Sequence, residues 1–122
     1  MSIKQAKLLD LLRQYDVKRS ATTEVIASFE RFVADNADCC ERSLSIGHLT
    51  GSAWLVSKDG ERALLMHHRK LKRWLQPGGH ADGSPDLAQV ALREAIEETG
   101  LSDLQVQPDI FDLDCHIIPA RG

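Results

Sequence analysis

Long apolar runs, cysteines and aromatic residues are all scarce in this chain of 122 residues. The apolar runs span only a few residues, so none is long enough to cross a bilayer or to form the core of a signal peptide. Aromatic residues make up 5% of the chain, so leucine, isoleucine, valine and alanine must build its hydrophobic core. We therefore expect a single cytoplasmic domain.

The three cysteines do not form a pattern that binds zinc or builds a disulfide framework. Their number is odd, Cys39 and Cys40 are adjacent, Cys115 lies far away, and no CxxC pair is present. A metal or redox site at the adjacent pair stays open as an alternative. Small, partly buried thiols in a reducing compartment are the main expectation.

An excess of positive charge is also lacking. The chain has 15 lysines and arginines against 18 aspartates and glutamates, which gives a formal net charge of −3. Proteins that bind the phosphate backbone or an anionic membrane usually carry a basic excess. We therefore expect neither a nucleic-acid polymer nor a membrane as partner.

Residues 1–42 have the pattern of a helical hairpin that precedes the rest of the fold. Thr22 or Thr23 is the expected cap of the second helix. No cluster of catalytic side chains is present here, so covering the core, capping a site and forming a homodimer contact all stay open. Apolar residues recur at helical spacing in two segments, Ile3, Ala6, Leu8, Leu9, Leu11 and Leu12, and Val25, Ile26, Phe29, Phe32 and Val33.

Residues 43–122 form the second predicted part, in which strands precede one helix. Apolar runs at 51–56 and 63–66 flank Asp59-Gly60, a pair typical of a type I′ hairpin turn. Two more extended segments are expected at 104–106 and 110–118. We place Trp54 and Trp74 in the core.

The helix of this part is predicted from about Asp86 to Thr99, with Gly100 as its terminator. A rotation of about 100° per residue divides its side chains into two arcs. The apolar arc should face the core and contains Leu87, Ala88, Ala91, Leu92, Ala95 and Ile96.

The neighbouring arc holds three carboxylates, Glu94, Glu97 and Glu98. Like charges three and four residues apart, near the carboxyl end of a helix, destabilise that helix. A divalent cation would relieve the repulsion, and carboxylate oxygens suit Mg²⁺ or Mn²⁺. Arg93 precedes Glu97 by four residues, a spacing that would allow it to hold this carboxylate.

The segment from Gly79 to Leu101 resembles the Nudix box, whose pattern is G-x5-E-x7-R-E-U-x-E-E-x-G-U with U an aliphatic residue. The nonapeptide REAIEETGL at 93–101 follows Gly79 at the family spacing, and residues 74–79 have the form W-x-x-P-G-G. The resemblance implies an α/β/α sandwich around a mixed sheet. Few residues follow the box, so we expect the carboxyl-terminal part of that fold to be missing.

The resemblance also implies a function, namely hydrolysis of a diphosphate linked to another moiety, often a nucleoside. Glu94, Glu97, Glu98 and the Gly78 carbonyl would ligate Mg²⁺ or Mn²⁺, and Arg93 would orient a glutamate. Water would attack phosphorus, with either Glu94 or Glu97 as general base. The expected partner is therefore a small diphosphate.

One position departs from the family pattern. Pro85 stands where the first glutamate of the box belongs, which puts support of the loop in doubt more than catalysis. Asp86 would either replace that glutamate or serve as an acidic first-turn residue of the helix.

Side chains that would bind substrate are predicted from charge alone. Arg69, Lys70, Lys72 and Arg73 precede the glycine loop, where they would bind phosphate or simply protect an exposed edge strand. His80 follows the double glycine, where it would either face the metal site or make a structural hydrogen bond, and His116 is a further candidate for the site.

Two other functions stay open. A Nudix-like binding or regulatory domain without activity commonly loses the helix glutamates, which this chain keeps. A prenyl-diphosphate isomerase of this fold needs a cysteine at a fixed motif, whereas Cys39 and Cys40 lie outside the predicted strands.

Overall fold

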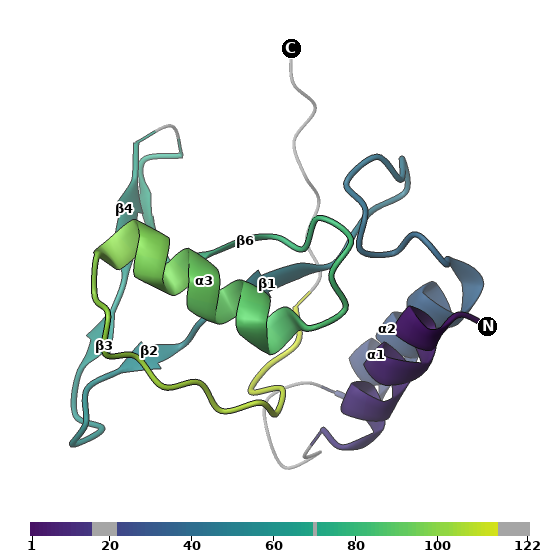
Figure 1. Ribbon diagram of the computed structural model, residues 1–122, viewed down its shortest axis with the longest axis horizontal. Coiled ribbons are helices and arrows are strands. Elements are labelled where there is room, and N and C mark those ends of the chain that lie inside the picture. Colours follow the sequence, from purple (N-terminus) through teal and green to yellow (C-terminus); the bar gives the residue numbers. More distant parts are fainter. Residues whose placement is uncertain (16–21, 70, 115–122) are drawn as a thin grey trace.

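The computed structural model describes residues 1–15, 22–69 and 71–114, which form a helical hairpin and a part built from short strands and one helix (Figure 1). This mixed α/β order with amino-terminal helices confirms the predicted fold class. The helices are α1 (Ile3–Arg13), α2 (Thr23–Asp35) and α3 (Leu87–Thr99). The strands are β1 (Thr50–Ser52), β2 (Leu55–Val56), β3 (Ala63–Leu64), β4 (Met66–His68), β5 (Arg73–Leu75) and β6 (Gly78–His80).

Hydroxyl side chains begin both helices of the hairpin. The Ser2 hydroxyl accepts a hydrogen bond from the Gln5 amide, and the Gln5 side chain accepts one from the Ser2 amide, which makes a capping box. Thr22, one of the two expected caps, accepts from the amide of Val25 at the start of α2. The predicted helical hairpin is therefore confirmed.

The buried face of α1 differs from the predicted stripe. Leu8, Leu9 and Leu12 are buried as expected, but Ile3 is exposed and Gln5 is buried in its place. At about 100° per residue, Ile3 lies almost opposite Leu8 on the helix, whereas Gln5 lies about 60° from Leu8. The first-turn isoleucine therefore belongs to the solvent side.

Buried Gln5 joins the two helices. Its Nε2 atom donates hydrogen bonds to the carbonyl oxygens of Val33 at 2.9 Å and Ala34 at 3.2 Å. These carbonyls belong to the last turn of α2, where backbone oxygens lack partners within the helix. The Gln5 side chain thus hydrogen-bonds to backbone groups at the start of α1 and at the end of α2.

The described strands pair in three two-stranded antiparallel sheets, β1 with β6, β2 with β3, and β4 with β5. We expected one mixed sheet, but each described strand is only two or three residues long and has one partner. Only two residues separate β1 from β2, so residues 50–56 contribute to two of the sheets. The register of β1 and β6 places Gly51 opposite Gly79.

The predicted hairpin forms between β2 and β3, although its turn is not type I′. Gly60 has a φ of 75°, whereas Asp59 does not have the positive φ that a type I′ turn requires. The Asp59 carboxylate instead accepts hydrogen bonds from the Ser57 hydroxyl and the Glu61 amide. These bonds hold a longer turn and lower the pKa of Asp59.

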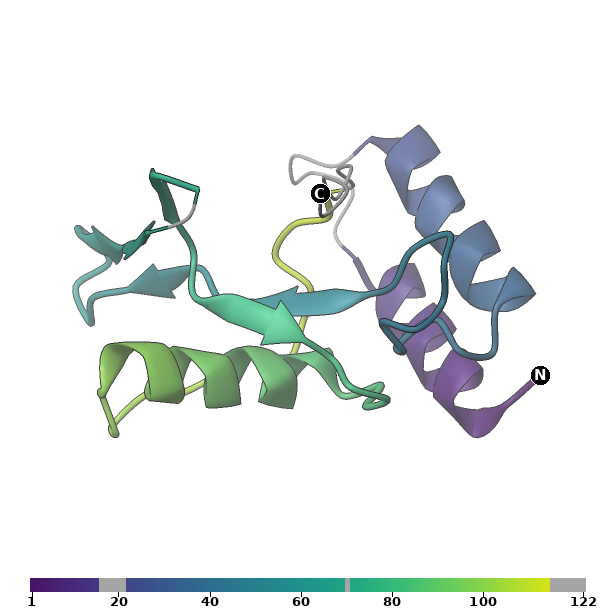
Figure 2. The same cartoon turned by 90° about the horizontal axis from the view of Figure 1, so that it is seen from above.

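Helix α3 lies along the β1–β6 sheet (Figure 2). Asp86 is its cap and accepts a hydrogen bond from the Gln89 amide at 3.3 Å, with Pro85 directly before it. Asp86 therefore caps α3 from the position before its first turn, whereas the second alternative placed it inside that turn. Gly100 ends α3 in the left-handed conformation, as predicted.

Packing of α3 depends on a glycine in β1. A side-chain carbon on Gly51 would lie 3.0 Å from Cγ1 of Val90, so only glycine allows this close approach. Val90 is buried, although the sequence did not place it on the core face. Ile96 was expected on that face but is exposed. The predicted apolar arc was therefore rotated relative to the face that contacts the strands.

One hydrophobic core joins the hairpin to α3. Of the three roles left open for the hairpin, the contacts show that it covers the core. The buried residues of the cluster are Leu8, Leu9, Leu12, Val33, Cys39, Cys40, Leu49, Ala81 and Val90.

Some segments lie outside this core. Trp54 and Trp74 are 45% and 65% exposed, so their predicted burial was wrong. The expected strands at 104–106 and 110–118 are not formed up to residue 114, and 115–118 fall outside the described residues. Within the described ranges, no helix has the length and apolar character to cross a membrane.

Candidate functional site

Two glutamates of α3 face the double glycine of β6. A side-chain carbon on Gly79 would lie 2.7 Å from Cδ of Glu94, so the bare glycine backbone makes room for this carboxylate. One turn further along, Oε2 of Glu98 accepts a hydrogen bond from the Gly78 amide at 3.1 Å. The absence of side chains at 78 and 79 thus allows strand backbone and helix carboxylates to meet.

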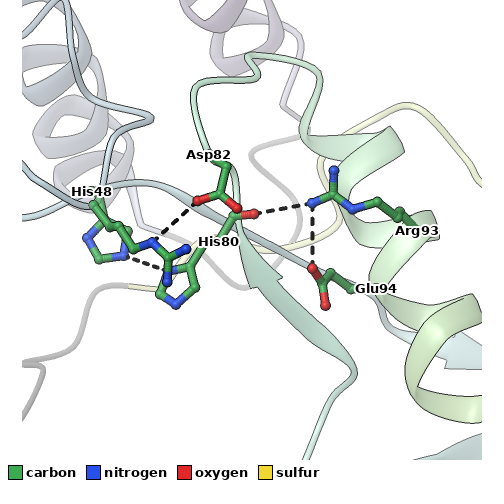
Figure 3. Close-up of polar contacts among 6 residues, drawn as sticks. His48, His80, Asp82, Arg93 and Glu94 are labelled. Carbon is green, nitrogen blue, oxygen red and sulfur yellow. Dashed lines mark hydrogen bonds and ion pairs between the residues drawn. The ribbon is translucent and has the colours of Figure 1, made fainter.

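Arg93 links α3 to β6 beside these carboxylates. Its Nη2 atom lies 3.5 Å from Oε1 of Glu94 and donates to the His80 carbonyl oxygen at 3.4 Å (Figure 3). The helical spacing had suggested a contact with Glu97. The guanidinium instead crosses towards β6, where it holds Glu94.

Glu97 lies to the other side of Glu94. With Gln89, Leu92, Arg93 and Ile96 it lines a groove of about 300 Å³ along the outer face of α3. In the part of the chain that the structure describes, no three His, Cys, Asp or Glu side chains are arranged to hold a metal ion. The Glu94 and Glu98 carboxylates nevertheless lie against neighbouring residues of β6, and carboxylate oxygens are donors that suit Mg²⁺ or Mn²⁺.

Neighbouring groups compensate the negative charge of these carboxylates only in part. Burial raises the pKa of Glu98, and the negative charges of Glu94 and Glu97 raise it further. The Gly78 amide and the nearby His68 act in the opposite direction. The charged form of Glu98 is therefore less favourable here than in water, and a nearby cation would lower that cost.

A second polar cluster lies on the opposite side of β6. Neighbouring residues of a strand point to opposite faces, so the His80 ring points away from the face where Gly79 meets Glu94. Nδ1 of His80 lies 3.3 Å from Nε2 of His48 (Figure 3), and Arg42 forms an ion pair of 3.4 Å with Asp82 close by. Burial lowers the pKa of His48, and the charges of His80 and Arg42 lower it further.

The other predicted substrate-binding residues lie on the β4–β5 hairpin. Arg73 pairs with His68 across these strands, so their side chains share the face that approaches Glu98. Arg69 follows β4 and is exposed. Lys70 and His116 fall outside the described residues.

Sequence reasoning missed His48, Arg42 and Asp82. None occupies a specified position of a recognisable motif, and His48 precedes His80 by 32 residues. Only the presence of a histidine just before the first strand could have pointed to this cluster.

The family comparison agrees with this geometry. The family model of the NUDIX domain matches residues 48–116, which is more than half of the chain. The protein therefore belongs to the Nudix family, and the predicted resemblance is confirmed. Nudix domains in general act as pyrophosphohydrolases. Comparison with curated proteins gives no match.

Proposed function

We propose that this protein is a divalent-metal-dependent pyrophosphohydrolase that cleaves a small diphosphate linked to another moiety such as a nucleoside. The observation that carries the proposal is the meeting of Glu94 and Glu98 with Gly78-Gly79, with Arg93 holding Glu94 in place. Such a pair of carboxylates destabilises its own helix unless a cation or a proton neutralises it.

Glu94, Glu98 and the Gly78 carbonyl would hold Mg²⁺ or Mn²⁺, with Glu97 approaching from the outer side of α3. All these donors are oxygens, which hard divalent cations prefer. When bound, the cation neutralises phosphate oxygens and lowers the pKa of a ligated water.

Glu97 is the general base of this proposal. Glu94 and Glu98 are engaged with β6, whereas the Glu97 carboxylate lies in the outer groove. It would take a proton from water as the water oxygen forms a bond to phosphorus. The bridging P–O bond breaks, and its electron pair leaves with the second phosphate.

Cations on the β4–β5 hairpin would bind the substrate phosphates. Arg73 is the stronger candidate because it shares a face with His68, whose charge reaches Glu98. Arg69 at the end of β4 would contribute to attraction of the polyanion.

The isomerase alternative is disfavoured by the thiols. Cys39 and Cys40 are 1% and 4% exposed, and burial raises the pKa of Cys40 to about 12. Neither thiol is available as an acid or a nucleophile. Two free, buried thiols also suit the cytoplasmic location that the sequence predicts.

The test is turnover of a panel of diphosphates in the presence of Mg²⁺ or Mn²⁺. We expect product formation that stops when EDTA is added and that incorporates oxygen from labelled water into phosphate. Glu97→Gln should lower kcat by about 100-fold or more, since general bases contribute about that factor. Glu61→Gln, at an exposed position in the β2–β3 turn, is the matched control and should retain full activity.

Two outcomes would overturn the proposal. Tight binding of a diphosphate without turnover would make the protein a binding domain of the same family. Full activity of Glu97→Gln would remove Glu97 from the role of general base.

A further inference from the structure

The proposed hydrolysis does not use the pair of imidazoles formed by His48 and His80. Both side chains are half-buried, and they come from chain segments held by the β1–β6 sheet. Thr50 pairs with His80 in that sheet, and His48 precedes Thr50 by two residues. Two potential metal ligands are thereby fixed side by side on one face.

The separation of the two rings matches the geometry of a shared metal ion. A tetrahedral Zn²⁺ bound to two imidazole nitrogens at about 2.05 Å would place those nitrogens about 3.3 Å apart and the ring centroids about 5.2 Å apart. In the structure, Nε2 of His48 and Nδ1 of His80 are 3.3 Å apart, and the centroids are 5.3 Å apart. The two nitrogens also lie within hydrogen-bonding distance, so a direct N–H···N bond would hold the rings in the same arrangement before a metal ion binds.

The surrounding charges are compatible with a bound cation. Asp82 and Arg42 form an ion pair beside the rings, so their opposite charges largely cancel. The neutral form of imidazole is the metal ligand, and the partial burial of His48 favours that form.

We propose that His48 and His80 bind one borderline transition-metal ion, with Zn²⁺ as the representative, and that water molecules complete its coordination. Imidazole nitrogens select such ions, whereas the carboxylates near Gly78-Gly79 suit Mg²⁺ or Mn²⁺. The site is thus separate from the one used for hydrolysis. It would tie the segment before β1 to the loop of the Nudix box.

The experiment is a Zn²⁺ titration of untagged, metal-free protein against a chromogenic chelator, without substrate. With excess Mg²⁺ present to occupy the carboxylates, we expect one saturable Zn²⁺ site, whose affinity falls at least tenfold in His48→Ala and in His80→Ala. His67→Ala is the matched control because His67 lies on β4, where its ring contacts Trp74. It should bind Zn²⁺ like the unaltered chain, and Glu98→Gln should also do so.

A measurement on the unaltered chain covers the case in which a histidine variant does not fold. The imidazole proton resonances of His48 and His80 should shift together as Zn²⁺ is added, while those of His67 stay unchanged.

Three outcomes would overturn the site. One is unchanged Zn²⁺ affinity in folded His48→Ala and His80→Ala. Another is loss of binding in Cys39→Ser, which would place the ion at the thiols. The third is loss of binding in Glu98→Gln, which would place it at the carboxylates. These experiments measure Zn²⁺ binding and no turnover. None of these results would therefore decide whether the protein hydrolyses diphosphates, which the turnover assay tests separately.

Discussion

A side-chain carbon on Gly79 would lie 2.7 Å from Cδ of Glu94. The carboxylate therefore occupies the space that any other residue at 79 would need. This relationship gives the second glycine of the P-G-G segment a physical role, because it sets how closely α3 and its glutamates approach β6.

Gly79→Ala should accordingly destabilise the protein by about 1–3 kcal/mol, the usual cost of inserting a methyl group into packed structure. It should also lower activity by displacing Glu94. A double-mutant cycle with Glu94→Ala isolates the contact when the free energy of unfolding of each variant is measured in urea. Most of the lost stability should return in the double variant, and strictly additive losses would contradict the assigned clash.

Arg93 should matter for its shape as well as its charge. Both Arg93→Ala and Arg93→Lys should lower kcat/KM by about 10–100-fold, as is common for residues that orient metal ligands. A single ammonium cannot replace the guanidinium between Glu94 and the His80 carbonyl. Steady-state kinetics with Arg62→Ala as the exposed control would test this, and full activity of Arg93→Lys would refute the bridging role.

Glu98 should make the metal-free protein less stable as pH rises. Its pKa in the folded state is raised above the ordinary value of 4.5, mainly by burial. The folded state therefore loses stability as pH rises from that value through the folded pKa, because the charged form is disfavoured there. Glu98→Gln should lack this loss and be more stable at neutral pH by a few tenths of a kcal/mol, the size of like-charge helix pairs.

Urea unfolding in EDTA from about pH 4 to about pH 7 measures this difference. Added Mg²⁺ should reverse the order of stability, since only the unaltered chain keeps the full set of carboxylates. A metal-free Glu98→Gln that is less stable at neutral pH would contradict the raised pKa.

Gln5 should be essential for the hairpin. Gln5→Ala leaves the carbonyls of Val33 and Ala34 without their side-chain donor and should cost about 1–3 kcal/mol. Gln14→Ala is the matched control, because its side-chain amide is exposed and donates to the Asp10 carboxylate four residues earlier on the same helix. Equal unfolding free energies for the two variants would show that the buried amide does not stabilise the hairpin.

Local features of the fold were predictable. Thr22, Asp86 and Gly100 begin or end helices through contacts within three or four residues, so a single stretch of sequence contains the whole signal. The position of the turn at Asp59-Gly60 was predicted correctly, but its type was not. The Asp59 side chain bonds to the Ser57 hydroxyl and the Glu61 amide, which favours the longer turn.

Burial was less predictable than helix position. Ile96 and Trp74 are apolar, yet they are exposed because the strands pair in separate short sheets that cover only part of the molecule. Val90 was missed because the glycine that admits it lies almost forty residues earlier, in β1.

By itself, the sequence determined the helical hairpin, the family and the three glutamates of α3, since each depends on spacing within one continuous segment. Only the tertiary structure decided that Glu94 and Glu98 meet β6 while Glu97 lies in the outer groove. It alone brought His48 beside His80. The physical reason is that these contacts require strands distant in sequence to pair in one register, and no local pattern of residues specifies that register.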